Sequence, residues 1–445
     1  MPRHEPHAPV SGATPRLTRR RALSAGSAAT LAAARLLAPA VFTGCSAGLP
    51  SGRRPLPLGL LHSQTGTLAI SETSVRDAEI LAVEEINAAG GVLGRPLEVM
   101  CPDPKSRSAD LFPKRARQLC ERGAVALFGC WTSTSRKAVI PVCAEFKRLL
   151  FYPLQYEGNE SSEHVVYGGS VPNQQILPAV DWLFSSAGGR RRKIFLLGSD
   201  YVFPRTANLI VKKYLRARDI EPVGEAYLPL GHTQFRGVVE MIDASRADCV
   251  LSTINGDSNI AFFEALAAGG IDAEKVPVVS TSVGEDELRN LAPEHVRGHY
   301  AAWSYFQSVP GAANRSWVEQ FRREFGYDRV TSDPMEAAYA LVHLWKLAVE
   351  RAGSVATDAV RQALREGLEV AAPGGPLRVD PKTQHCAKPF RLGRIRADRQ
   401  FDIVHESAGP IEPDPYPQIA FPGWKCDWMQ GGLERGAEVR IDGDV

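Results

Sequence analysis

Short apolar segments alternate with segments of helical periodicity along most of this chain. In the first half the apolar segments are "LPLGLLHS", "PLEVMCPD", "AVALFGC" and "RLLFYP". The residues between them repeat apolar positions at helical spacing, which predicts helices at 71–89, 110–121 and 132–146. The order strand, helix, strand predicts a parallel sheet with helices on both faces, because each crossover returns the chain to the same end of the sheet.

The alternation then starts again with new segments of similar size. Further strands are predicted at "KIFLLGSD", "EPVGEAYLP", "ADCVLSTIN" and "VPVVST", separated by helices, and residues 390–396 and 401–406 are typical of a hairpin or of two edge strands. The chain has 445 residues, more than one hydrophobic core usually serves. We therefore expect an α/β fold with two doubly wound parallel-sheet lobes.

The first 45 residues have the composition of an export signal. A cluster of three arginines, Arg19–Arg21, is followed by an Ala- and Leu-rich stretch and then by Gly44 and Cys45. The arginines resemble the twin-arginine export motif, and the end of the stretch resembles a bacterial lipobox, whose cysteine is lipidated. Arg35 interrupts the apolar stretch, which argues against a membrane-spanning anchor. We expect contact with a membrane only through a lipid on Cys45.

Other classes of protein find little support in the composition. The net charge is only +2, and no long basic run follows the first few dozen residues, so no nucleic-acid partner is expected. No Cys-x-x-Cys pair, zinc-like spacing or phosphate loop occurs, and no Gly-x-Ser-x-Gly elbow lies between a predicted strand and the helix after it. We expect no cofactor, no metal and no enzymatic activity; an amide hydrolase is the alternative of a different class.

The predicted strands end in polar or aromatic residues. In open parallel sheets ligands bind beyond the carboxyl ends of the strands, where helix N-terminal N–H groups point the same way. Ser, Thr and Asp are also the preferred helix caps, so each of them alone is weak evidence. Trp131 and Tyr201 are too large for capping, and each follows a strand of a different lobe. These two residues are the strongest candidates for a ligand site.

Several of the longer motifs resemble one family. "GCWTSTSRKAVIPV", "LLFYPLQYEGNE", "GSDYVFPRTANLI" and "GHYAAWSYFQSV" are similar to segments of the urea-type substrate-binding proteins of bacterial ABC transporters, which are type I periplasmic binding proteins. The resemblance runs from about residue 56 to about residue 417. It implies two lobes joined by three crossovers, with the ligand between them. The expected division is an export signal at 1–45, lobe 1 at 56–168 and 299–367, lobe 2 at 169–298 and 368–417, and a tail at 418–445.

The resemblance also suggests which residues hold the ligand. Trp131 and Ser133 match an aromatic and a serine at the family's ligand, Gln155 agrees with the urea-type pattern, and Tyr201 matches a tyrosine that closes over the ligand. Residues at other strand ends and near a crossover complete the expectation. The expected ligand-binding residues are Trp131, Ser133, Tyr152, Gln155, Tyr201, Asn255, Asp257, Ser282 and Tyr305.

The function implied is that of an exported solute receptor in the periplasm or on the outer face of the cytoplasmic membrane. It would deliver urea or a short amide to an ABC permease when its lobes close. Urea is flat and neutral, with four N–H donors and one carbonyl acceptor, and so needs acceptors and a flat apolar face. Two alternatives within the same fold stay open: an amide sensor with a regulatory role, and a branched-chain amino-acid binder.

Overall fold

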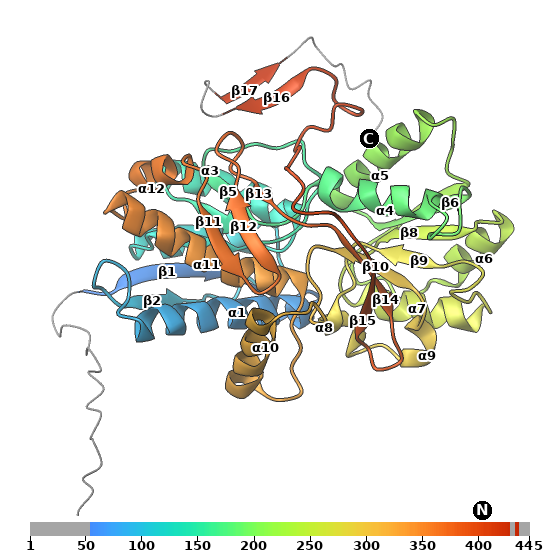
Figure 1. Ribbon diagram of the computed structural model, residues 1–445, viewed down its shortest axis with the longest axis horizontal. Helices are drawn as coiled ribbons and strands as arrows, with labels where there is room; N and C mark the ends of the chain where they lie inside the picture. The colour runs from blue at the N-terminus through green and yellow to red at the C-terminus, as the bar shows by residue number, and fades with distance from the viewer. Residues whose placement is uncertain (1–53, 428–431, 436–445) are drawn as a thin grey trace, which may run out of the picture. The chain divides into compact units, whose positions relative to one another are not determined.

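The computed structural model describes residues 54–427 and 432–435. The predicted export signal at 1–45, including Cys45, lies outside these residues, as does most of the end of the predicted tail. The described chain is an α/β fold built on two large sheets, as expected (Figure 1). We call the part built on the five-stranded sheet lobe 1 and the part built on the seven-stranded sheet lobe 2.

The sheet of lobe 1 is parallel throughout, in the order β2-β1-β3-β4-β5. Its strands are buried on both faces, which explains why they are continuous apolar runs. Alternate residues of β3 enter different cores: Leu127 packs with α2 and α3, whereas Phe128 packs with α1, α11 and α12. The strands are β1 (Leu56–Leu61), β2 (Leu97–Met100), β3 (Ala126–Gly129), β4 (Leu150–Tyr152) and β5 (Val165–Tyr167). The helices are α1 (Ala69–Ala88), α2 (Leu111–Glu121), α3 (Ser133–Phe146), α10 (Ala312–Phe325), α11 (Asp333–Ala352) and α12 (Thr357–Leu364).

The sheet of lobe 2 has the order β15-β14-β10-β9-β8-β6-β7. Strands β10, β9, β8, β6 and β7 are parallel to one another. Strands β14 and β15 form an antiparallel hairpin at the edge, one of the two arrangements expected from the sequence. The strands are β6 (Ile194–Ser199), β7 (Gly224–Leu228), β8 (Cys249–Thr253), β9 (Val278–Ser280), β10 (Tyr300–Trp303), β14 (Arg391–Ile395) and β15 (Phe401–Glu406). The helical segments are η1 (Pro172–Gln174), α4 (Ile176–Phe184), α5 (Val202–Arg216), α6 (Arg236–Ala244), α7 (Ser258–Ala268), α8 (Glu285–Leu288) and α9 (Pro293–Val296).

Two smaller sheets complete the described chain. Strands β11 (Glu369–Ala372), β12 (Gly375–Val379) and β13 (Cys386–Ala387) are antiparallel, and Leu377 and Cys386 belong to the same core cluster as Trp345 of lobe 1. Strands β16 (Trp424–Asp427) and β17 (Gly432–Arg435) pair as a hairpin.

The chain passes between the two lobes three times, but two passages lie elsewhere than expected. β10 pairs with β9 and β14, so residues 300–303 belong to lobe 2 rather than to the stretch 299–367 assigned to lobe 1. Residues 369–387 pack with lobe 1, although the stretch 368–417 was assigned to lobe 2. Backbone pairing decides the first membership and core packing decides the second, and neither is visible in local periodicity.

Candidate functional site

The turn from β3 into α3 brings the first candidates to the edge of the lobe 1 sheet. Gly129 has a φ of 113°, and a Cβ there would lie 2.6 Å from the carbonyl oxygen of Leu61. Only glycine therefore fits this close approach of β3 to β1. Thr132 then caps α3, because its hydroxyl oxygen accepts a hydrogen bond from the Ser135 N–H at 3.0 Å. The hydroxyl cluster after β3 thus includes a genuine helix cap at Thr132.

Trp131 lies in this turn with its side chain turned into lobe 1. It is 7% exposed and belongs to the core cluster that also contains Tyr152 and Val139. Its carbonyl oxygen accepts a hydrogen bond from the Tyr152 hydroxyl at 3.1 Å. Trp131 and Tyr152 are therefore held together, as the sequence placed them at neighbouring strand ends, and a role of the indole at a ligand stays a prediction.

A buried arginine organises the side chains around Ser133. Arg136 is fully buried, and its Nη1 donates to Ser133 Oγ at 3.2 Å while its Nε donates to Glu160 Oε1 at 2.6 Å. Its guanidinium carbon lies 4.7 Å from the ring centroid of Tyr152 and 4.3 Å from that of Tyr156. The cation is thus enclosed by two aromatic rings and by hydrogen-bond acceptors, which is how a buried charge is tolerated.

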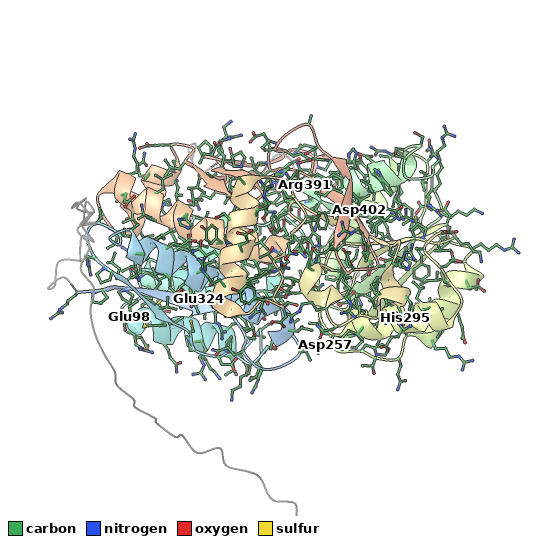
Figure 2. The ribbon with its side chains drawn as sticks, turned by 60° about the horizontal axis from the view of Figure 1, so that its bottom comes forward. Glu98, Asp257, His295, Glu324, Arg391 and Asp402 are labelled. Carbon is green, nitrogen blue, oxygen red and sulfur yellow. The ribbon has the colours of Figure 1, made fainter. Side chains whose placement is uncertain are left out.

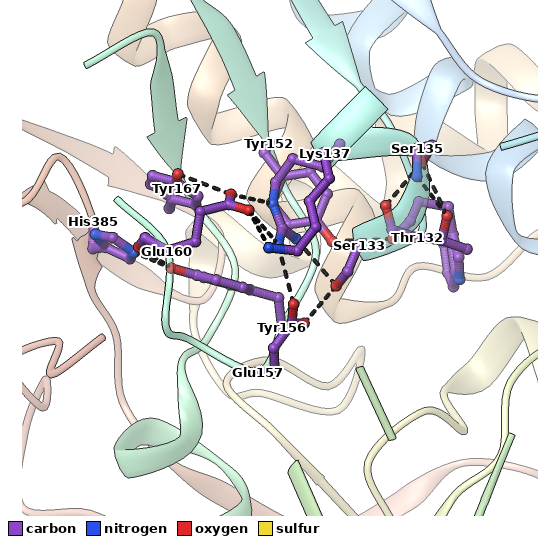
Figure 3. Close-up of polar contacts among 12 residues, drawn as sticks. Thr132, Ser133, Ser135, Lys137, Tyr152, Tyr156, Glu157, Glu160, Tyr167 and His385 are labelled. Atoms are coloured by element: carbon purple, nitrogen blue, oxygen red, sulfur yellow. Dashed lines mark hydrogen bonds and ion pairs between the residues drawn. The ribbon is translucent and has the colours of Figure 1, made fainter. Parts of the chain in front are cut away.

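Two carboxylates share this arginine, those of Glu157 and Glu160, and both are labelled in Figure 3. Ser133 Oγ donates to Glu157 Oε2 at 2.5 Å, and Arg136 Nη2 lies 3.5 Å from Glu157 Oε1. Burial by itself would raise the pKa of Glu160, but Arg136 and Lys137 outweigh it and hold this pKa at about 2. We call Ser133, Arg136, Glu157, Glu160 and the two tyrosine rings the arginine cluster.

Gln155 connects the two lobes. Its Nε2 donates to the carbonyl oxygen of Thr281 at 3.0 Å and lies 3.3 Å from Ser282 Oγ. A carbonyl only accepts, so the amide nitrogen must face lobe 2 and the orientation of the amide is determined. Gln155 Oε1 is buried and has no hydrogen-bond partner within the described part of the chain. Gln155 and Ser282, two predicted site residues from different lobes, therefore do meet.

Tyr201 extends from the N-terminal end of α5 in lobe 2. Burial raises the pKa of Tyr201, and Tyr152 and Glu157 of lobe 1 raise it further, while Arg136 and a hydrogen bond with Asn255 lower it. The phenol therefore stays neutral and remains a hydrogen-bond donor. Asn255 is 2% exposed, and its Nδ2 donates to the Thr253 carbonyl oxygen at 3.1 Å. Tyr201 directly precedes α5, and α5 contacts α3 of lobe 1, the helix that carries Ser133 and Arg136.

Two predicted site residues lie apart from these contacts. Tyr305 is 1% exposed in the core of lobe 1, its hydroxyl donates to Asn314 Oδ1 at 2.7 Å, and its ring packs edge-on against Trp317. Its hydroxyl and ring are both used within lobe 1, and a role of Tyr305 at the ligand stays a prediction. Asp257 is exposed at the periphery (Figure 2), although burial raises its pKa above the usual value. It is not part of the buried group.

The passages between the lobes are tied together by one carboxylate. Asp333 Oδ2 accepts hydrogen bonds from the backbone N–H groups of Ser304 and Tyr305, both at 2.9 Å. Asp333 also forms a buried ion pair with Lys388 at 3.4 Å. Ser170 Oγ lies 3.0 Å from Ser304 Oγ. All three passages thus contribute to one buried polar network.

A second contact between the lobes consists of carboxylates on α8. Ser71 Oγ of α1 donates to Glu287 Oε1 at 2.6 Å, and the Gly284 N–H donates to Glu287 Oε2 at 2.8 Å. Burial and the neighbouring Glu287 raise the pKa of Asp286 to about 7, against the lowering effect of Arg329 and Ser74. Burial also raises the pKa of Glu287.

Sequence reasoning missed Arg136 and Glu157. Arg136 lies one helical turn after Ser133, so the two share a face of α3, and Glu157 follows Gln155 by two residues. A charged residue at that spacing from a candidate serine is a usable signal. Across the described stretches of the chain, no group of three or more His, Cys, Asp and Glu side chains is arranged to hold a metal ion. No helix among those residues is long and apolar enough to cross a membrane.

Several known proteins are similar to this chain. Leu/Ile/Val-binding protein homolog 6 of Brucella melitensis is 24% identical over 207 residues, which cover 46% of this chain and 53% of that protein. Limonene hydroxylase of Geobacillus stearothermophilus is 28% identical over 125 residues, which cover 28% of this chain and 23% of that protein. The chain thus aligns with about half and about a quarter, respectively, of these curated relatives.

The solved structures agree with the fold over greater lengths. A solute-binding protein of an ABC transporter from R. palustris, in complex with 4-hydroxybenzoate, has a TM-score of 0.71 at 19% identity, covering 81% of this chain and 98% of that one. The branched-chain amino acid transporter substrate-binding protein of Streptococcus pneumoniae, in complex with isoleucine, has a TM-score of 0.70 at 18% identity, covering 81% and 100%. Residues 56–421 match the periplasmic binding protein domain family, and this chain belongs to that family.

Proposed function

We propose that this protein is an exported solute-binding protein that delivers urea or a short-chain amide to an ABC permease. Family membership supports binding of a small solute, and the similar ABC-transporter proteins support the permease as partner. Closure of the two lobes on the ligand would create the form that the permease recognises.

The observation that carries the proposal is the orientation of Gln155. Its Nε2 is committed to the Thr281 carbonyl, so its buried Oε1 is left as an acceptor without a partner in the described residues. A buried acceptor without a donor costs free energy, and a ligand N–H would remove that cost. Tyr201 supplies a neutral hydroxyl donor from lobe 2 for the ligand's carbonyl oxygen. Trp131, Ser133, Tyr152, Asn255 and Ser282 complete the proposed ligand site.

The test is calorimetry with ureas, short amides and amino acids on the domain without its leader. Tiny ligands gain at most about −1.5 kcal/mol per non-hydrogen atom, so the four atoms of urea give a ceiling near −6 kcal/mol. This corresponds to a Kd on the order of tens of micromolar. Tight binding of isoleucine or leucine, with no response to urea or amides, would instead support the amino-acid alternative that the Leu/Ile/Val-binding relatives suggest.

The proposal places the protein outside the cytoplasm, held by a lipid on Cys45 after export by the twin-arginine route. We expect Cys45→Ala to move the protein from the membrane fraction to the soluble periplasmic fraction, because the lipid on Cys45 is the only anchor in this proposal. Fractionation and mass spectrometry of the N-terminal peptide measure this. An unmodified Cys45 in the wild type would contradict the anchor, and a cytoplasmic location would favour the amide sensor.

A further inference from the structure

The guanidinium of Arg136 makes its hydrogen bonds to other residues of the arginine cluster. Arg136 donates through Nε and Nη2 to Glu160, at 2.6 and 3.3 Å, and through Nη1 to Ser133 Oγ. The rings of Tyr152 and Tyr156, which are perpendicular to each other, both lie beside its guanidinium carbon. The fork that would otherwise grip a carboxylate in a bidentate manner is therefore already occupied.

Ser133 is not a free donor either. A serine hydroxyl has one proton, and Ser133 Oγ donates it to Glu157 Oε2 at 2.5 Å. One lone pair of the same oxygen accepts from Arg136 Nη1. What Ser133 still offers is an acceptor, which a ligand carboxylate cannot use.

Glu157 has acceptor capacity beyond these contacts. Its side chain is 2% exposed, and it receives Ser133 Oγ on one oxygen and the more distant Arg136 Nη2, at 3.5 Å, on the other. A carboxylate has about four acceptor positions. Lobe 2 approaches this part of lobe 1: Gln155, two residues before Glu157, donates to Thr281 of lobe 2, and α3 contacts α5.

The charges around this point do not favour an anion. Arg136 and Lys137 contribute two positive charges, and Glu157 and Glu160 contribute two negative ones, so the net charge of these four residues is zero. The positive charge of Lys137 is on its half-exposed side chain, whereas Glu157 is buried. A ligand carboxylate entering beside Glu157 would meet like charge at low dielectric, which is strongly unfavourable.

We propose that Glu157 is the specificity-determining residue of this site, accepting a ligand N–H and excluding carboxylates, and that Arg136 is the positioning residue that holds Glu157 and Ser133 for this purpose. The inference rests on the proposed function and narrows its ligand class to neutral N–H donors without a carboxylate. It separates this chain from the similar proteins solved with 4-hydroxybenzoate and isoleucine, which both carry a carboxylate.

Acetamide and acetate provide the matched test, because they share a shape and differ in an NH₂ group against an oxygen anion. We expect wild-type protein to bind acetamide and urea, and to bind acetate at least 100-fold more weakly. Glu157→Gln releases the Ser133 hydroxyl and raises the net charge of the four residues named above from zero to +1. The ratio of the acetamide affinity to the acetate affinity should therefore fall by on the order of 10- to 100-fold, the usual effect of one hydrogen bond to a charged group. Calorimetry measures both affinities.

Glu163→Gln is the control, because Glu163 lies on the same loop and pairs with Arg361 instead. The ratio of acetamide affinity to acetate affinity in Glu163→Gln should equal that of the wild type. If Glu157→Gln does not fold, wild-type protein alone decides: acetate, isoleucine or 4-hydroxybenzoate bound as tightly as acetamide overturns the inference. Amide binding with an unchanged ratio in folded Glu157→Gln overturns the inference and leaves the proposed function standing. Carboxylate binding without any amide binding overturns both.

Discussion

The two lobes bring different chemistry to the place where they meet. Lobe 1 presents a charged and aromatic cluster in which the buried Arg136 contacts two tyrosine rings and two carboxylates. At the candidate ligand site, lobe 2 contributes small neutral groups such as Asn255 and Ser282, and one longer side chain, Tyr201, whereas its α8 carboxylates form a separate contact with lobe 1. A buried charged network is rigid when all its groups are satisfied. We infer that lobe 1 holds the preformed half of the site and that lobe 2 completes it on closure.

Removing Arg136 is the strongest challenge to this comparison. Arg136→Met leaves Glu157 and Glu160 buried without their cation, so we expect a loss of about 3–5 kcal/mol in the free energy of unfolding. In lobe 2, Arg205 follows a strand end as well, but its ion pair with Asp200 is about half exposed. Arg205→Met should therefore cost at most about 1 kcal/mol. Guanidinium chloride unfolding measures both, since urea is a proposed ligand. Equal losses would contradict a rigid lobe 1 and an adaptable lobe 2.

Trp131→Ala tests how far the preformed half extends. Trp131 packs in the lobe 1 core, so we expect a loss of stability of about 3 kcal/mol in addition to weaker ligand binding. Trp317→Ala is the matched control, because Trp317 is 4% exposed in the same core cluster and lies outside the proposed site. It should lose similar stability and keep the wild-type Kd. Full ligand affinity in folded Trp131→Ala would show that the indole serves the core alone.

The carboxylates of α8 predict a pH dependence of closure. In the closed arrangement the pKa of Asp286 is about 7, whereas an Asp exposed by opening has a pKa of about 4. Between about pH 4 and pH 7, Asp286 therefore takes up a proton when the lobes close. Protonation stabilises the closed form fully below about pH 4, and this stabilisation is lost as the pH rises through about 7. We expect affinity to fall by on the order of 100-fold between pH 5 and pH 8.

The groups that face Asp286 are Glu285 and Glu287 on α8, Arg289 after it, and Ser74 and Arg329 of lobe 1. Asp286→Asn should flatten the pH profile of the Kd measured by calorimetry. Asp272→Asn, a substitution at an exposed lobe 2 residue, should leave that profile unchanged. A wild-type affinity that rises with pH would contradict a closed form stabilised by protonation.

Tyr201→Phe should change ligand affinity least, and it tests the contribution of one hydroxyl group of lobe 2. It removes one neutral hydroxyl donor, so we expect about fivefold to tenfold weaker binding of urea or amide, equivalent to about 1 kcal/mol. The melting temperature without ligand should stay within about one degree, because the ring remains to pack against Phe203. A large loss of stability with unchanged affinity would place Tyr201 in the structural part of lobe 2.

Much of the fold could be predicted because it is written in local periodicity. The strand at 126–129 and the helix after it were placed within one or two residues, since an apolar run followed by Thr132 as a cap is a local pattern. The edge hairpin of β14 and β15 was also visible as two polar-apolar segments joined by a turn. The assignment of β10 and of residues 369–387 to lobes was not, because β10 pairs with β14 and His385 bridges to Tyr167, partners that lie far away in the sequence.

Some features of the candidate site could likewise be predicted from the sequence, and others could not. The alternation of strands and helices alone determined that Trp131, Ser133, Gln155 and Tyr201 would lie at carboxyl ends of strands, since a parallel sheet collects those ends at one edge. Tertiary structure alone decided that Tyr305 faces the lobe 1 core, that Gln155 reaches Thr281 of lobe 2, and that Arg136 gathers Ser133 and Glu157. The physical reason is that a buried side chain takes the orientation in which its polar atoms find partners, and those partners come from segments distant in the sequence.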